Sequence, residues 1–391
     1  MRSTQVAIIG AGPSGLILAR LLRLEGIDAV VVERRSREYV EARVRAGLLE
    51  WNTVELLREA GVGERMMRDG LVHDGVELVF AGGSHRIDLK SLAGCSVLVY
   101  GQTELQRDLG QLLCAEPGAV VWEASDVTLE EWEGPRPAMS YTSEGVRHTV
   151  RCDFIAGCDG FHGVSRGCVP REKIVQYERI YPFGWIGLLA EAPPVSQELV
   201  YANHERGFAL CSMRSRSRSR YYVQCPLEDT VHHWPDERFW SELHARLPAA
   251  HASRLVTGPS IEKTLAPLRS FVAEPMRFGR LFLVGDAAHI VPPTGAKGLN
   301  LAAADARLLA RGLVELYGNG SETLLDEYSR RALDRVWKAT RFSWWFTSLM
   351  HRFSPDPFAH RLQIAELSYL AESQAASRCL AENYTGVALE R

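Results

Sequence analysis

The chain has 391 residues, of which 46% are hydrophobic and 24% charged, and its formal net charge is −3. This composition excludes a wholly disordered chain, and the near-neutral charge provides no general attraction to nucleic acid or to an anionic membrane. The length allows two or three domains, each with its own core.

The eight cysteines include no Cys-x-x-Cys pair and no zinc-type spacing with histidine. We therefore expect free thiols in a reducing compartment and no metal site. The N-terminus enters a predicted strand without a basic region or a cleavage site, and no apolar run approaches 18 residues. These features favour a cytoplasmic protein that does not bind a membrane.

The chain begins with a predicted strand at residues 5–9, a glycine-rich turn at 10–15, an apolar helix from about 16 to 24 and a second strand at 29–33. In such a βαβ unit, Gly10 makes the turn, Gly12 lets the backbone approach a pyrophosphate and Gly15 lets the helix pack on the strand. Glu33 ends the second strand, where a carboxylate accepts hydrogen bonds from ribose. The segment predicts a Rossmann-like dinucleotide fold.

A basic segment follows, Arg34-Arg35-Ser36-Arg37-Glu38-Tyr39, and helical spacing continues through Arg43, Arg45 and Glu50. Two interpretations remain open. The arginines form a solvated helix face, as most charged runs do, or some of them contact nucleotide phosphates.

Residues 73–100 alternate polar and apolar, which predicts antiparallel strands, and Gln102 opens a helix that runs to about Cys114. A further strand at 151–157 leads into Asp159-Gly160. An Asp-Gly pair alone usually marks only a turn. This one gains weight because it lies between two glycine motifs.

From about 177 to 267 the pattern becomes strand-like, with one helix near 237–247, and we interpret it as an inserted antiparallel domain. Within it, the serine- and arginine-rich run 212–220 fits a hairpin better than an RNA-binding tract. A turn near 215–219 would place Ser212 beside Arg214, and Arg220 beside Tyr222, on one face of each strand. A hydroxyl, a guanidinium and a phenol suit a planar carboxylate. A solvent-facing hairpin is the alternative.

The apolar strand 280–284 ends in Gly285-Asp286, and prolines, glycines and a helix follow. This order predicts a ligand-binding corner, since amides at a helix start favour an anionic group and Asp286 can accept from a sugar hydroxyl. An ordinary strand-to-helix connection is the alternative. The helical end of the chain carries Trp337, Trp344 and Trp345, which we expect in a core or a dimer interface.

The three motifs Gly10-x-Gly12-x-x-Gly15, Asp159-Gly160 and Gly285-Asp286 with Pro292-Pro293 occur in an order that resembles the single-component FAD-dependent aromatic hydroxylases. Further stretches that match are Tyr181 to Trp185, Tyr201 to His204, Pro293 to Asn300 and Glu382 to Tyr384. The resemblance runs from the first strand to about Tyr384.

The resemblance implies an α/β fold in three parts. Residues 1–175 would form a Rossmann-like FAD-binding domain with a strand-rich insertion near 73–100. Residues 176–267 would form an antiparallel-sheet substrate domain, and 268–391 would add the return strand with the Gly-Asp motif and a helical C-terminal region.

The resemblance also implies the reaction, which is 3-hydroxylation of 4-hydroxybenzoate to 3,4-dihydroxybenzoate with FAD, NAD(P)H and O2. The flavin C4a-hydroperoxide would attack the substrate as a phenolate. Arginines near 34–37 favour the 2′-phosphate of NADPH, although relatives with similar segments use NADH, so NADPH is the expected donor and NADH the alternative. A homodimer is expected, without a nucleic-acid partner.

Site residues follow by matching positions. FAD would be held by Gly10, Gly12, Ser14, Gly15, Glu33, Arg43, Val44, Arg45, Ala46, Gly47, Leu48, Gln102, Asp159, Gly160, Arg220, Asp286, Leu299 and Asn300. The substrate would be bound by Tyr201, Ser212, Met213, Arg214, Tyr222 and Pro293. The catalytic set would be Tyr201, Tyr384, His73, Pro293, Lys297 and Asn300. The nicotinamide nucleotide would meet Arg34, Arg35, Tyr39, Arg45, His162 and Arg269. Met213 departs from the family pattern, which often has glutamine there.

The roles implied for these residues fit the chemistry. An electrophilic oxygen needs an electron-rich ring, so the phenol must lose its proton near neutral pH. Tyr201 and Tyr384 could form a hydrogen-bonded relay, with His73 exchanging protons with water, while Arg220, Lys297 and Asn300 would tune the charge and position of the flavin. In the structural alternative, buried tyrosines merely satisfy their hydroxyls.

Two other enzymatic interpretations stay open. The same flavin chemistry could act on another hydroxy- or aminobenzoate, or the first βαβ unit could belong to a flavin-free NAD-linked dehydrogenase. The Gly-Asp corner disfavours the dehydrogenase, and the negative net charge disfavours a nucleic-acid-binding module.

Overall fold

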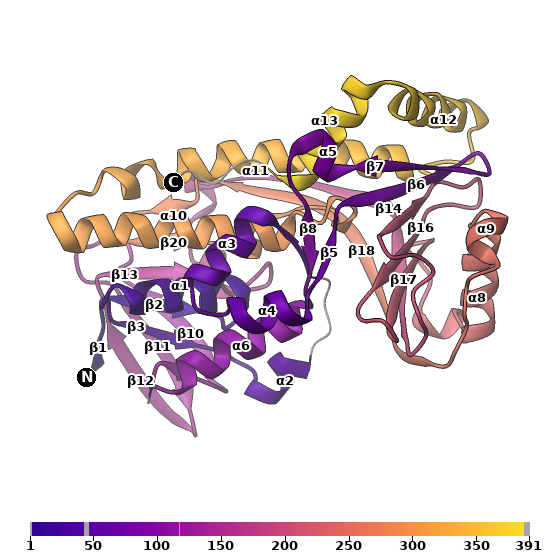
Figure 1. Cartoon of the computed structure of the whole chain (residues 1–391). Coiled ribbons are helices and arrows are strands. Elements are labelled where there is room, and N and C mark those ends of the chain that lie inside the picture. Colours follow the sequence, from indigo (N-terminus) through magenta and orange to yellow (C-terminus); the bar gives the residue numbers. More distant parts are fainter. Residues whose placement is uncertain (1, 43–46, 117, 387–391) are drawn as a thin grey trace.

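The computed structural model describes residues 2–42, 47–116 and 118–386 (Figure 1). Its first layer is a six-stranded sheet in the order β19-β20-β13-β2-β3-β9. The central strands are β2 (Val6–Ile9), β3 (Ala29–Val32), β13 (Phe154–Gly157) and β20 (Leu281–Leu283), and β9 (Val120–Val121) and β19 (Arg277–Phe278) lie at the edges. All neighbours run parallel except β19 and β20. Because helices cover parallel strands on both faces, these strands are continuous apolar runs.

Two long helices pack against each other beside this sheet. Helix α1 (Pro13–Leu24) begins at the glycine turn and contacts α10 (Gly298–Asn319), which begins after the Gly-Asp corner. Helix α10 runs along α11 (Thr323–Met350), as the two orange helices in Figure 1 show. The starts of α1 and α10 therefore lie near the same end of the parallel strands.

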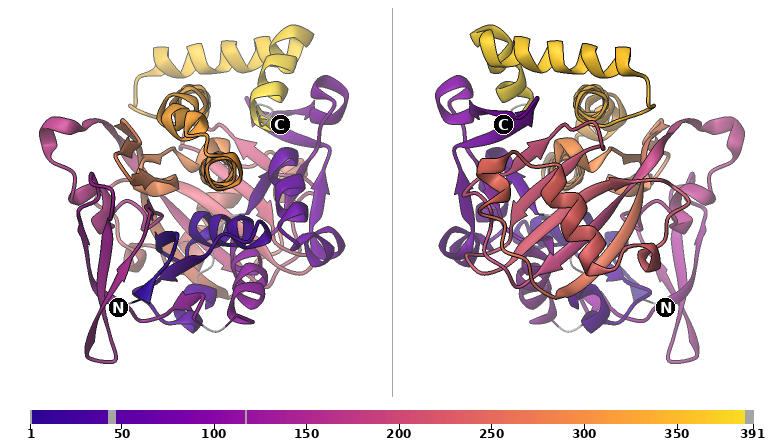
Figure 2. Two further views of the ribbon diagram at one scale, coloured as in Figure 1. Left: turned by 90° about the vertical axis from the view of Figure 1, so that its left-hand side faces the viewer. Right: turned by 90° about the vertical axis from the view of Figure 1, so that its right-hand side faces the viewer.

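Two smaller sheets complete the N-terminal half. One joins β1 (Arg2–Ser3) to the meander β10 (Ser125–Glu130), β11 (Ala138–Ser143) and β12 (Val146–Arg151), which stands at the outer side of the molecule (Figure 2). The other joins β4 (Leu48–Glu50), β8 (Val97–Val99) and β5 (Leu71–His73). The helices between them are α2 (Arg37–Ala42), α3 (Trp51–Glu59), α4 (Gly63–Asp69), α5 (Leu89–Ala93) and α6 (Gln102–Cys114).

An eight-stranded sheet forms the other large layer, in the order β21-β18-β14-β17-β16-β15-β6-β7. Its members are β6 (Gly75–Phe80), β7 (Gly83–Asp88), β14 (Val175–Ala190), β15 (Val200–Ala202), β16 (Ala209–Met213), β17 (Ser219–Cys225), β18 (Ser260–Glu274) and β21 (His289–Ile290). One face packs on α8 (Asp236–Ala245) and α9 (Ala249–Ala252) through an apolar cluster that includes Tyr221, Val223 and Phe239. The opposite face carries Trp185, Tyr201 and Leu210 toward the C-terminal helices.

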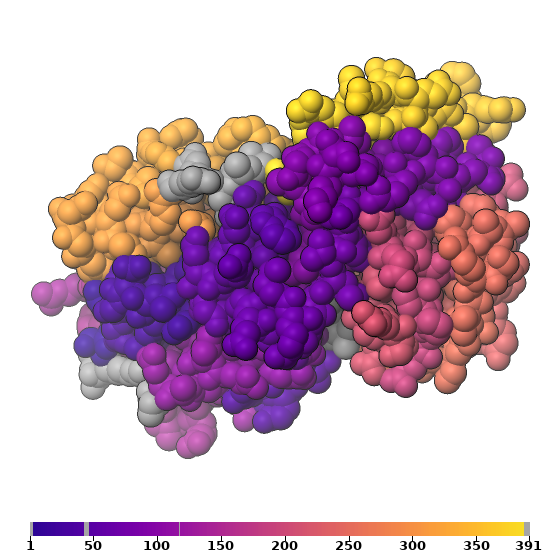
Figure 3. Space-filling view, in the orientation of Figure 1, coloured from indigo at the N-terminus to yellow at the C-terminus, as the bar shows by residue number. Residues whose placement is uncertain are grey.

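The C-terminal helices α12 (Pro357–Glu372) and α13 (Gln374–Thr385) close the top of the molecule in Figure 1. Helix α13 packs on α5 and β7, so the violet residues of this early segment lie beside the yellow C-terminal helices in Figure 3. Helix α12 remains on the outside. It exposes Phe358, Leu362 and Tyr369.

The architecture confirms the α/β class, with parallel and antiparallel sheets and a helical C-terminal region. Two details differ from the sequence expectations. Residues 48–50 form a strand rather than the end of a helix, because they pair with β8. Strands β6 and β7 lie within 73–100 yet belong to the large sheet, where β6 runs parallel to β15. The division at residues 175 and 267 stays a prediction.

Candidate functional site

The glycine turn between β2 and α1 is shaped for close backbone approach. Gly10 has φ of +101°, and a Cβ there would lie 2.4 Å from the carbonyl oxygen of Cys158. A Cβ on Gly15 would lie 2.0 Å from the carbonyl oxygen of Gly10, whereas a Cβ on Gly12 would have no atom of the described residues outside its own chain neighbours within 4 Å. Two glycines are thus required by packing within the protein, while Gly12 faces open space at the start of α1. That arrangement suits an anionic ligand at a helix N-terminus.

Acidic groups surround this turn. Glu33 Oε2 accepts a hydrogen bond from the amide of Ala11 (2.9 Å), which sets the carboxylate beside the turn. Asp159 is largely buried, its Oδ2 accepts from the amide and hydroxyl of Ser165 (both 2.9 Å), and burial raises the pKa of its carboxyl. Its Oδ1 is buried and has no partner among the described residues. Gly160 follows with φ of +75°.

The Gly-Asp corner lies at the ends of β20 and α10. Gly285 and Asp286 form a 3-10 turn in which Gly285 is buried and Asp286 is exposed. Ser14, buried at the start of α1, faces this turn, since a Cβ on Gly285 would lie 3.3 Å from its hydroxyl oxygen. The first turn of α1 and the corner therefore meet.

The start of α10 is tied to β4. The Asn300 side chain accepts from the amide of Glu50 (2.9 Å) and donates to the carbonyl of Leu48 (3.1 Å). Leu299 beside it is half-buried. Gly47 packs against residue 100, because a Cβ there would lie 1.8 Å from the carbonyl oxygen of Tyr100, and Gln102 is buried at the start of α6.

These features fit a flavin dinucleotide. The open space at Gly12, the unpartnered Asp159 oxygen and the exposed Asp286 carboxylate lie along the ends of the parallel strands, as a ligand with phosphates and sugar hydroxyls requires. Of the expected FAD residues, Arg43, Val44, Arg45 and Ala46 lie outside the described residues. The others line the glycine turn, the corner, the β4 segment and, for Arg220, the large sheet.

The large sheet gathers the expected substrate residues on one face. The register places Tyr201 opposite Leu210, Leu210 opposite Tyr222 and Tyr222 opposite Gly187. Ser212 lies opposite Arg220 in the next row on that face. Because directly opposed residues of adjacent strands project to the same side, the side chains of Tyr201, Ser212, Arg220 and Tyr222 share the face that α8 and α9 do not cover.

Ser212 and Arg214 meet at one end of this face. Arg214 Nη1 donates to the Ser212 hydroxyl (3.0 Å) and to the carbonyl of Met213 (3.3 Å). Burial lowers the pKa of Arg214, with the Tyr222 hydroxyl close by. The Arg214 Nε is buried and has no acceptor among the described residues. A guanidinium whose buried Nε is free to donate is suited to an anionic ligand.

The side chain of Arg220 is held by other residues of the large sheet. Its Nη2 donates to the Thr264 hydroxyl (2.6 Å), its Nη1 lies 3.4 Å from Glu262, and its guanidinium lies 5.4 Å from the centre of the Tyr222 ring. A Cβ on Gly187 would lie 2.9 Å from the Tyr222 ring and 3.1 Å from Arg220. Glycine at 187 thus provides the room that both side chains occupy.

Two tyrosines meet at the other end. The hydroxyls of Tyr201 on β15 and Tyr384 on α13 lie 2.7 Å apart, and both residues are buried. Phe346 packs on Tyr201, with ring centres 5.1 Å apart. Burial raises the pKa of both phenols, so both are neutral at physiological pH. Pro293 is exposed at the start of a 3-10 turn, where its carbonyl accepts from Ala296 (2.9 Å).

His73 lies apart from the tyrosine pair in its contacts. It is 1% exposed, its Nε2 lies 3.2 Å from the Met213 sulfur, and its Nδ1 has no partner among the described residues. Burial lowers the pKa of His73 to about 4. No direct hydrogen bond joins it to Tyr384 within the part of the chain that the structure describes.

Lys297 is buried in an ion pair. Its Nζ donates to Glu50 Oε1 (2.6 Å) and to the Tyr384 carbonyl (2.9 Å), and it lies 5.3 Å from the centre of the Phe342 ring. Lys297 thus connects β4, α13 and the end of the Gly-Asp corner. No role for Glu50 could be predicted from the sequence, because nothing local marks it as the partner of a residue 247 positions away.

The residues expected to meet a nicotinamide nucleotide fall into two groups. Arg34, Arg35 and Tyr39 are exposed near α2, and the Arg35 guanidinium lies 5.1 Å from the centre of the Tyr39 ring. His162 and Arg269 both contact Phe161, at 5.0 Å between ring centres and at 4.6 Å from the guanidinium to the ring centre. Arg45 lies outside the described residues.

A buried histidine, His351, lies on the same side of the large sheet as the expected substrate residues, and it was not predicted from the sequence. His351 Nε2 accepts from the Trp185 indole (2.7 Å), its Nδ1 faces the Thr347 carbonyl (3.0 Å), and its ring stacks on Phe183 at 4.8 Å. Burial lowers the pKa of His351 to about 3. It thereby fixes Trp185, whose ring centre lies 5.1 Å from that of Tyr222.

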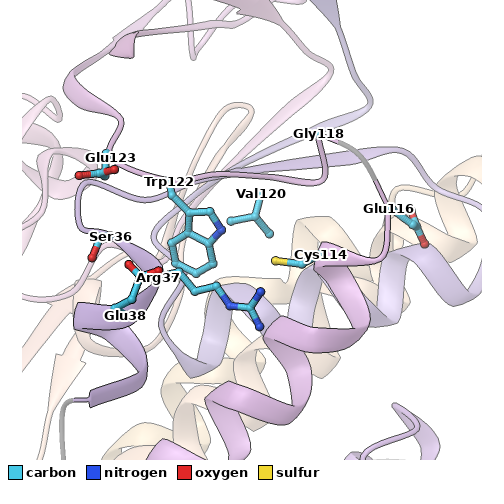
Figure 4. A pocket seen from close by; sticks show the side chains of 9 residues that line it. All are labelled: Ser36, Arg37, Glu38, Cys114, Glu116, Gly118, Val120, Trp122 and Glu123. Carbon is cyan, nitrogen blue, oxygen red and sulfur yellow. The ribbon is translucent and has the colours of Figure 1, made fainter. Parts of the chain in front are cut away.

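A separate hollow of about 450 Å³ lies between α2 and the end of α6 (Figure 4). Its lining includes Arg37, Cys114 and Trp122 together with Glu38, Glu116 and Glu123. Arg37 is already paired with Glu41, so we assign the hollow no ligand. The described residues contain no group of three or more potential metal ligands, and no described helix is long and apolar enough to cross a membrane.

The sequence is similar to a family model and to proteins of known activity. A family model described as FAD binding domain matches residues 3–343. The sequence is 54% identical over 389 residues to a p-hydroxybenzoate hydroxylase of Acinetobacter baylyi, covering 99% of this chain and 96% of that protein. It is 25% identical over 345 residues to a probable NADH-specific resorcinol 4-hydroxylase of Rhodococcus jostii, covering 84% and 62%.

Solved structures share the fold. The crystal structure of a p-nitrophenol 4-monooxygenase from Pseudomonas putida superposes with a TM-score of 0.83 at 20% identity, covering 99% of both chains. An aklavinone-11 hydroxylase in a ternary complex with FAD and aklavinone superposes with a TM-score of 0.73 at 21% identity, covering 90% of this chain and 70% of that one.

Proposed function

The chain belongs to the single-component FAD-dependent aromatic hydroxylases, the family with this FAD-binding domain, and on that premise we propose that it converts 4-hydroxybenzoate to 3,4-dihydroxybenzoate. The observation that carries the proposal is that a cationic group and, apart from it, a pair of neutral phenol hydroxyls lie on one face of the large sheet. The buried guanidinium of Arg214 lies at one end, and the hydrogen-bonded hydroxyls of Tyr201 and Tyr384 lie at the other. A flat acid with a para hydroxyl presents a carboxylate and a phenol in that order.

Arg214 binds the carboxylate of the substrate in this proposal. Its free Nε supplies a donor that the described residues leave unused, and the Ser212 hydroxyl and the Tyr222 phenol add neutral hydrogen bonds. A charge-assisted contact of this kind is stronger than a neutral one. Met213 holds the Arg214 guanidinium through its backbone carbonyl, and Pro293 offers its carbonyl near the Gly-Asp corner.

Tyr201 accepts the proton of the substrate hydroxyl into a hydrogen-bonded chain. Because both phenols are neutral, Tyr201 can donate to Tyr384 while it accepts from the substrate, and the proton moves without a buried charge on either tyrosine. The flavin would supply activated oxygen when bound, and an ionised phenol is much more reactive toward such an electrophile than a neutral one. His73 completes the route toward water. Since it has no direct bond to Tyr384, the route needs a water molecule or a side-chain movement between them.

Glu50, Lys297 and Asn300 hold the flavin end. The Lys297 to Glu50 pair and the Asn300 bonds to Glu50 and Leu48 fix the start of α10 against β4, so that both segments would be in place to hold the bound cofactor. Arg220 is hydrogen-bonded to Thr264 in the large sheet, where its positive charge would favour negative charge on the bound cofactor.

NADPH is the proposed electron donor, with NADH as the alternative, and O2 is the co-substrate. The exposed Arg34 and Arg35 support contact with a 2′-phosphate, and Arg269 with His162 supports a second contact near Phe161. A homodimer is also proposed. It is supported by Phe358, Leu362 and Tyr369 on the outer face of α12, which are 70%, 57% and 56% exposed. A cytoplasmic location completes the proposal.

A coupled assay tests the proposed function. The holoenzyme should oxidise NADPH slowly alone and at least tenfold faster with 4-hydroxybenzoate, releasing one 3,4-dihydroxybenzoate for each NADPH consumed. Parallel assays with NADH, with 4-aminobenzoate and with 2,4-dihydroxybenzoate measure the donor and the substrate range. Fast NADPH oxidation that yields only hydrogen peroxide, or faster hydroxylation of another benzoate, would contradict the proposed substrate.

A further inference from the structure

A buried histidine and aspartate form an ion pair beneath the Gly-Asp corner, outside the residues assigned above. His289 Nε2 on β21 lies 2.6 Å from Asp305 Oδ2 on α10, and each residue is 1% exposed. Burial tends to lower the pKa of His289, but the negative charges of Asp305 and Asp286 raise it. The pair therefore joins a strand of the large sheet to α10 through a charged contact with no access to water.

The same aspartate oxygen holds the first residue of the corner. Asp305 Oδ2 accepts a hydrogen bond from the Gly285 amide at 3.0 Å. Gly285 has φ of +64°, and a Cβ there would lie 3.0 Å from the Cβ of Ala302 on α10 and close to Ser14 on α1. One carboxylate oxygen thus fixes both a histidine ring and the backbone of a tightly enclosed turn. The next residue along the chain is the exposed Asp286.

The surroundings of the pair favour a positioning role over a stabilising one. Asp305 Oδ1 and His289 Nδ1 are both buried without a partner among the described residues. An incompletely satisfied buried ion pair is a poor source of stability, because desolvation offsets much of the attraction. The Tyr328 hydroxyl donates to the carbonyl of Leu283 (2.9 Å), so the end of β20 is also anchored from this side.

We propose that the His289 to Asp305 pair is a positioning device that presets the Gly285-Asp286 turn, so that the Asp286 carboxylate meets the ribityl hydroxyls of FAD. The proposal rests on the proposed function only for the identity of the cofactor. Asp305 aligns the turn through the Gly285 amide, and the positive charge of His289 attracts the Asp286 carboxylate, which narrows the range of positions that this carboxylate can take. The expected consequence of losing the pair is weaker FAD binding by a folded protein.

The test compares FAD binding by two conservative variants. Asp305→Asn keeps an oxygen that can accept from the Gly285 amide but removes the charge, and His289→Gln keeps a donor but removes the ring and the charge. Apoprotein of each is titrated with FAD while flavin fluorescence and absorbance are followed. Each variant should bind FAD at least tenfold more weakly than wild type. The double variant should be no weaker than the weaker single variant, because the two residues act as one unit.

His251→Gln is the matched control. His251 is 3% exposed and its Nε2 lies 3.0 Å from Glu77 Oε2, in a contact between α9 and β6 on the face of the large sheet away from the substrate residues. Its loss should lower the melting temperature of the apoprotein and leave FAD affinity within twofold of wild type. If His289→Gln and Asp305→Asn also stay within twofold, the proposal is wrong. Equal losses of FAD affinity in all three variants would show a merely structural role.

Hydrogen exchange in the wild-type protein provides a second measurement if a variant does not fold. The proposal predicts that the Gly285 amide exchanges slowly in the apoprotein and in the holoprotein alike, because Asp305 already holds it. Rapid exchange in the apoprotein that becomes slow only with FAD would show that the cofactor orders the turn, and would overturn the proposal. Neither measurement depends on the substrate, so failure of the proposed reaction would leave both interpretable.

Discussion

The hydroxyl oxygens of Tyr201 and Tyr384 lie 2.7 Å apart, although the two residues are 183 positions apart in sequence. One comes from a short central strand and the other from the last described helix, and both are buried. The contact gives each hydroxyl a partner, yet it leaves Tyr201 able to accept one more hydrogen bond. This remaining capacity is what a proton relay requires.

Tyr201→Phe should leave substrate binding nearly unchanged and reduce hydroxylation. Without the hydroxyl, the relay loses the group that accepts the proton of the substrate phenol, and we expect a loss of roughly a hundredfold or more in the rate of product formation. NADPH oxidation should continue with release of hydrogen peroxide. The ratio of product to NADPH consumed measures the effect. A wild-type ratio would remove Tyr201 from the relay.

Arg214→Gln should raise the KM for 4-hydroxybenzoate by roughly tenfold or more, since a hydrogen bond to a charged group contributes about 1.5–3 kcal/mol. Arg216→Gln is the matched control, because Arg216 is exposed at the turn of the same hairpin. Steady-state kinetics and substrate titration should give wild-type values for that control. Equal changes in both variants would show a general loss of positive charge rather than a specific contact.

Gly10→Ala should lower the stability of the protein, whereas Gly12→Ala should weaken FAD binding. Alanine at 10 meets the Cys158 carbonyl at 2.4 Å and forces a φ of +101°, so the apoprotein should be destabilised by several kcal/mol. The methyl group of an alanine at 12 would meet nothing within 4 Å in the part of the chain that the structure describes, so the apoprotein should melt as wild type. Its methyl group would instead occupy the space expected for the pyrophosphate and weaken FAD binding. Thermal melts and FAD titrations of both variants would distinguish these effects.

Lys297→Met should destabilise the protein by about 3–5 kcal/mol, because it leaves the Glu50 carboxylate buried without its partner. The double variant Lys297→Met with Glu50→Gln should recover much of that loss, since it removes both charges. Urea denaturation of the apoproteins measures the free energies of unfolding. A double variant that is less stable than the single one would argue against a compensating pair.

The lowered pKa of His351 predicts that the folded protein becomes less stable in acid. Its pKa is about 3 in the folded protein and 6.5 in the unfolded chain, so the unfolded chain takes up a proton first as the pH falls. The contribution of the neutral His351 to the stability of the folded protein is complete above pH 6.5. It is lost progressively as the pH falls to about 3. The resulting decrease in the free energy of unfolding between pH 6.5 and pH 5 is about 2 kcal/mol. In His351→Gln the free energy of unfolding should fall less over that range, and parallel curves for the two proteins would contradict the assignment.

Local signals were sufficient for the glycine turn and the hairpin. The spacing of Gly10, Gly12 and Gly15 depends on contacts within one βαβ unit. The alternation of residues around Ser212 and Arg220 determines which side chains lie on the same face of the sheet. The expected hairpin is present with its turn between the two strands, and the Arg214 to Ser212 contact follows from it.

Contacts between distant segments could not be predicted in the same way. Glu50 pairs with Lys297, and His73 lies against Met213, because separate strands and helices come together in the folded protein. No local periodicity encodes such contacts. The strand at 48–50 shows the same limit, since its helical spacing is overridden by pairing with β8.

The parallel pairing of β6 with β15 has a consequence for how the protein is made. Val200 of β15 pairs with Glu77 of β6, so the early strand must wait for a partner that leaves the ribosome roughly 120 residues later, on the order of ten seconds at typical rates of synthesis. A two-stranded ribbon is barely stable alone. The nascent chain therefore carries the exposed edge of β6 during that interval, and slower translation of residues 90–200 should lengthen its exposure to chaperones and to aggregation.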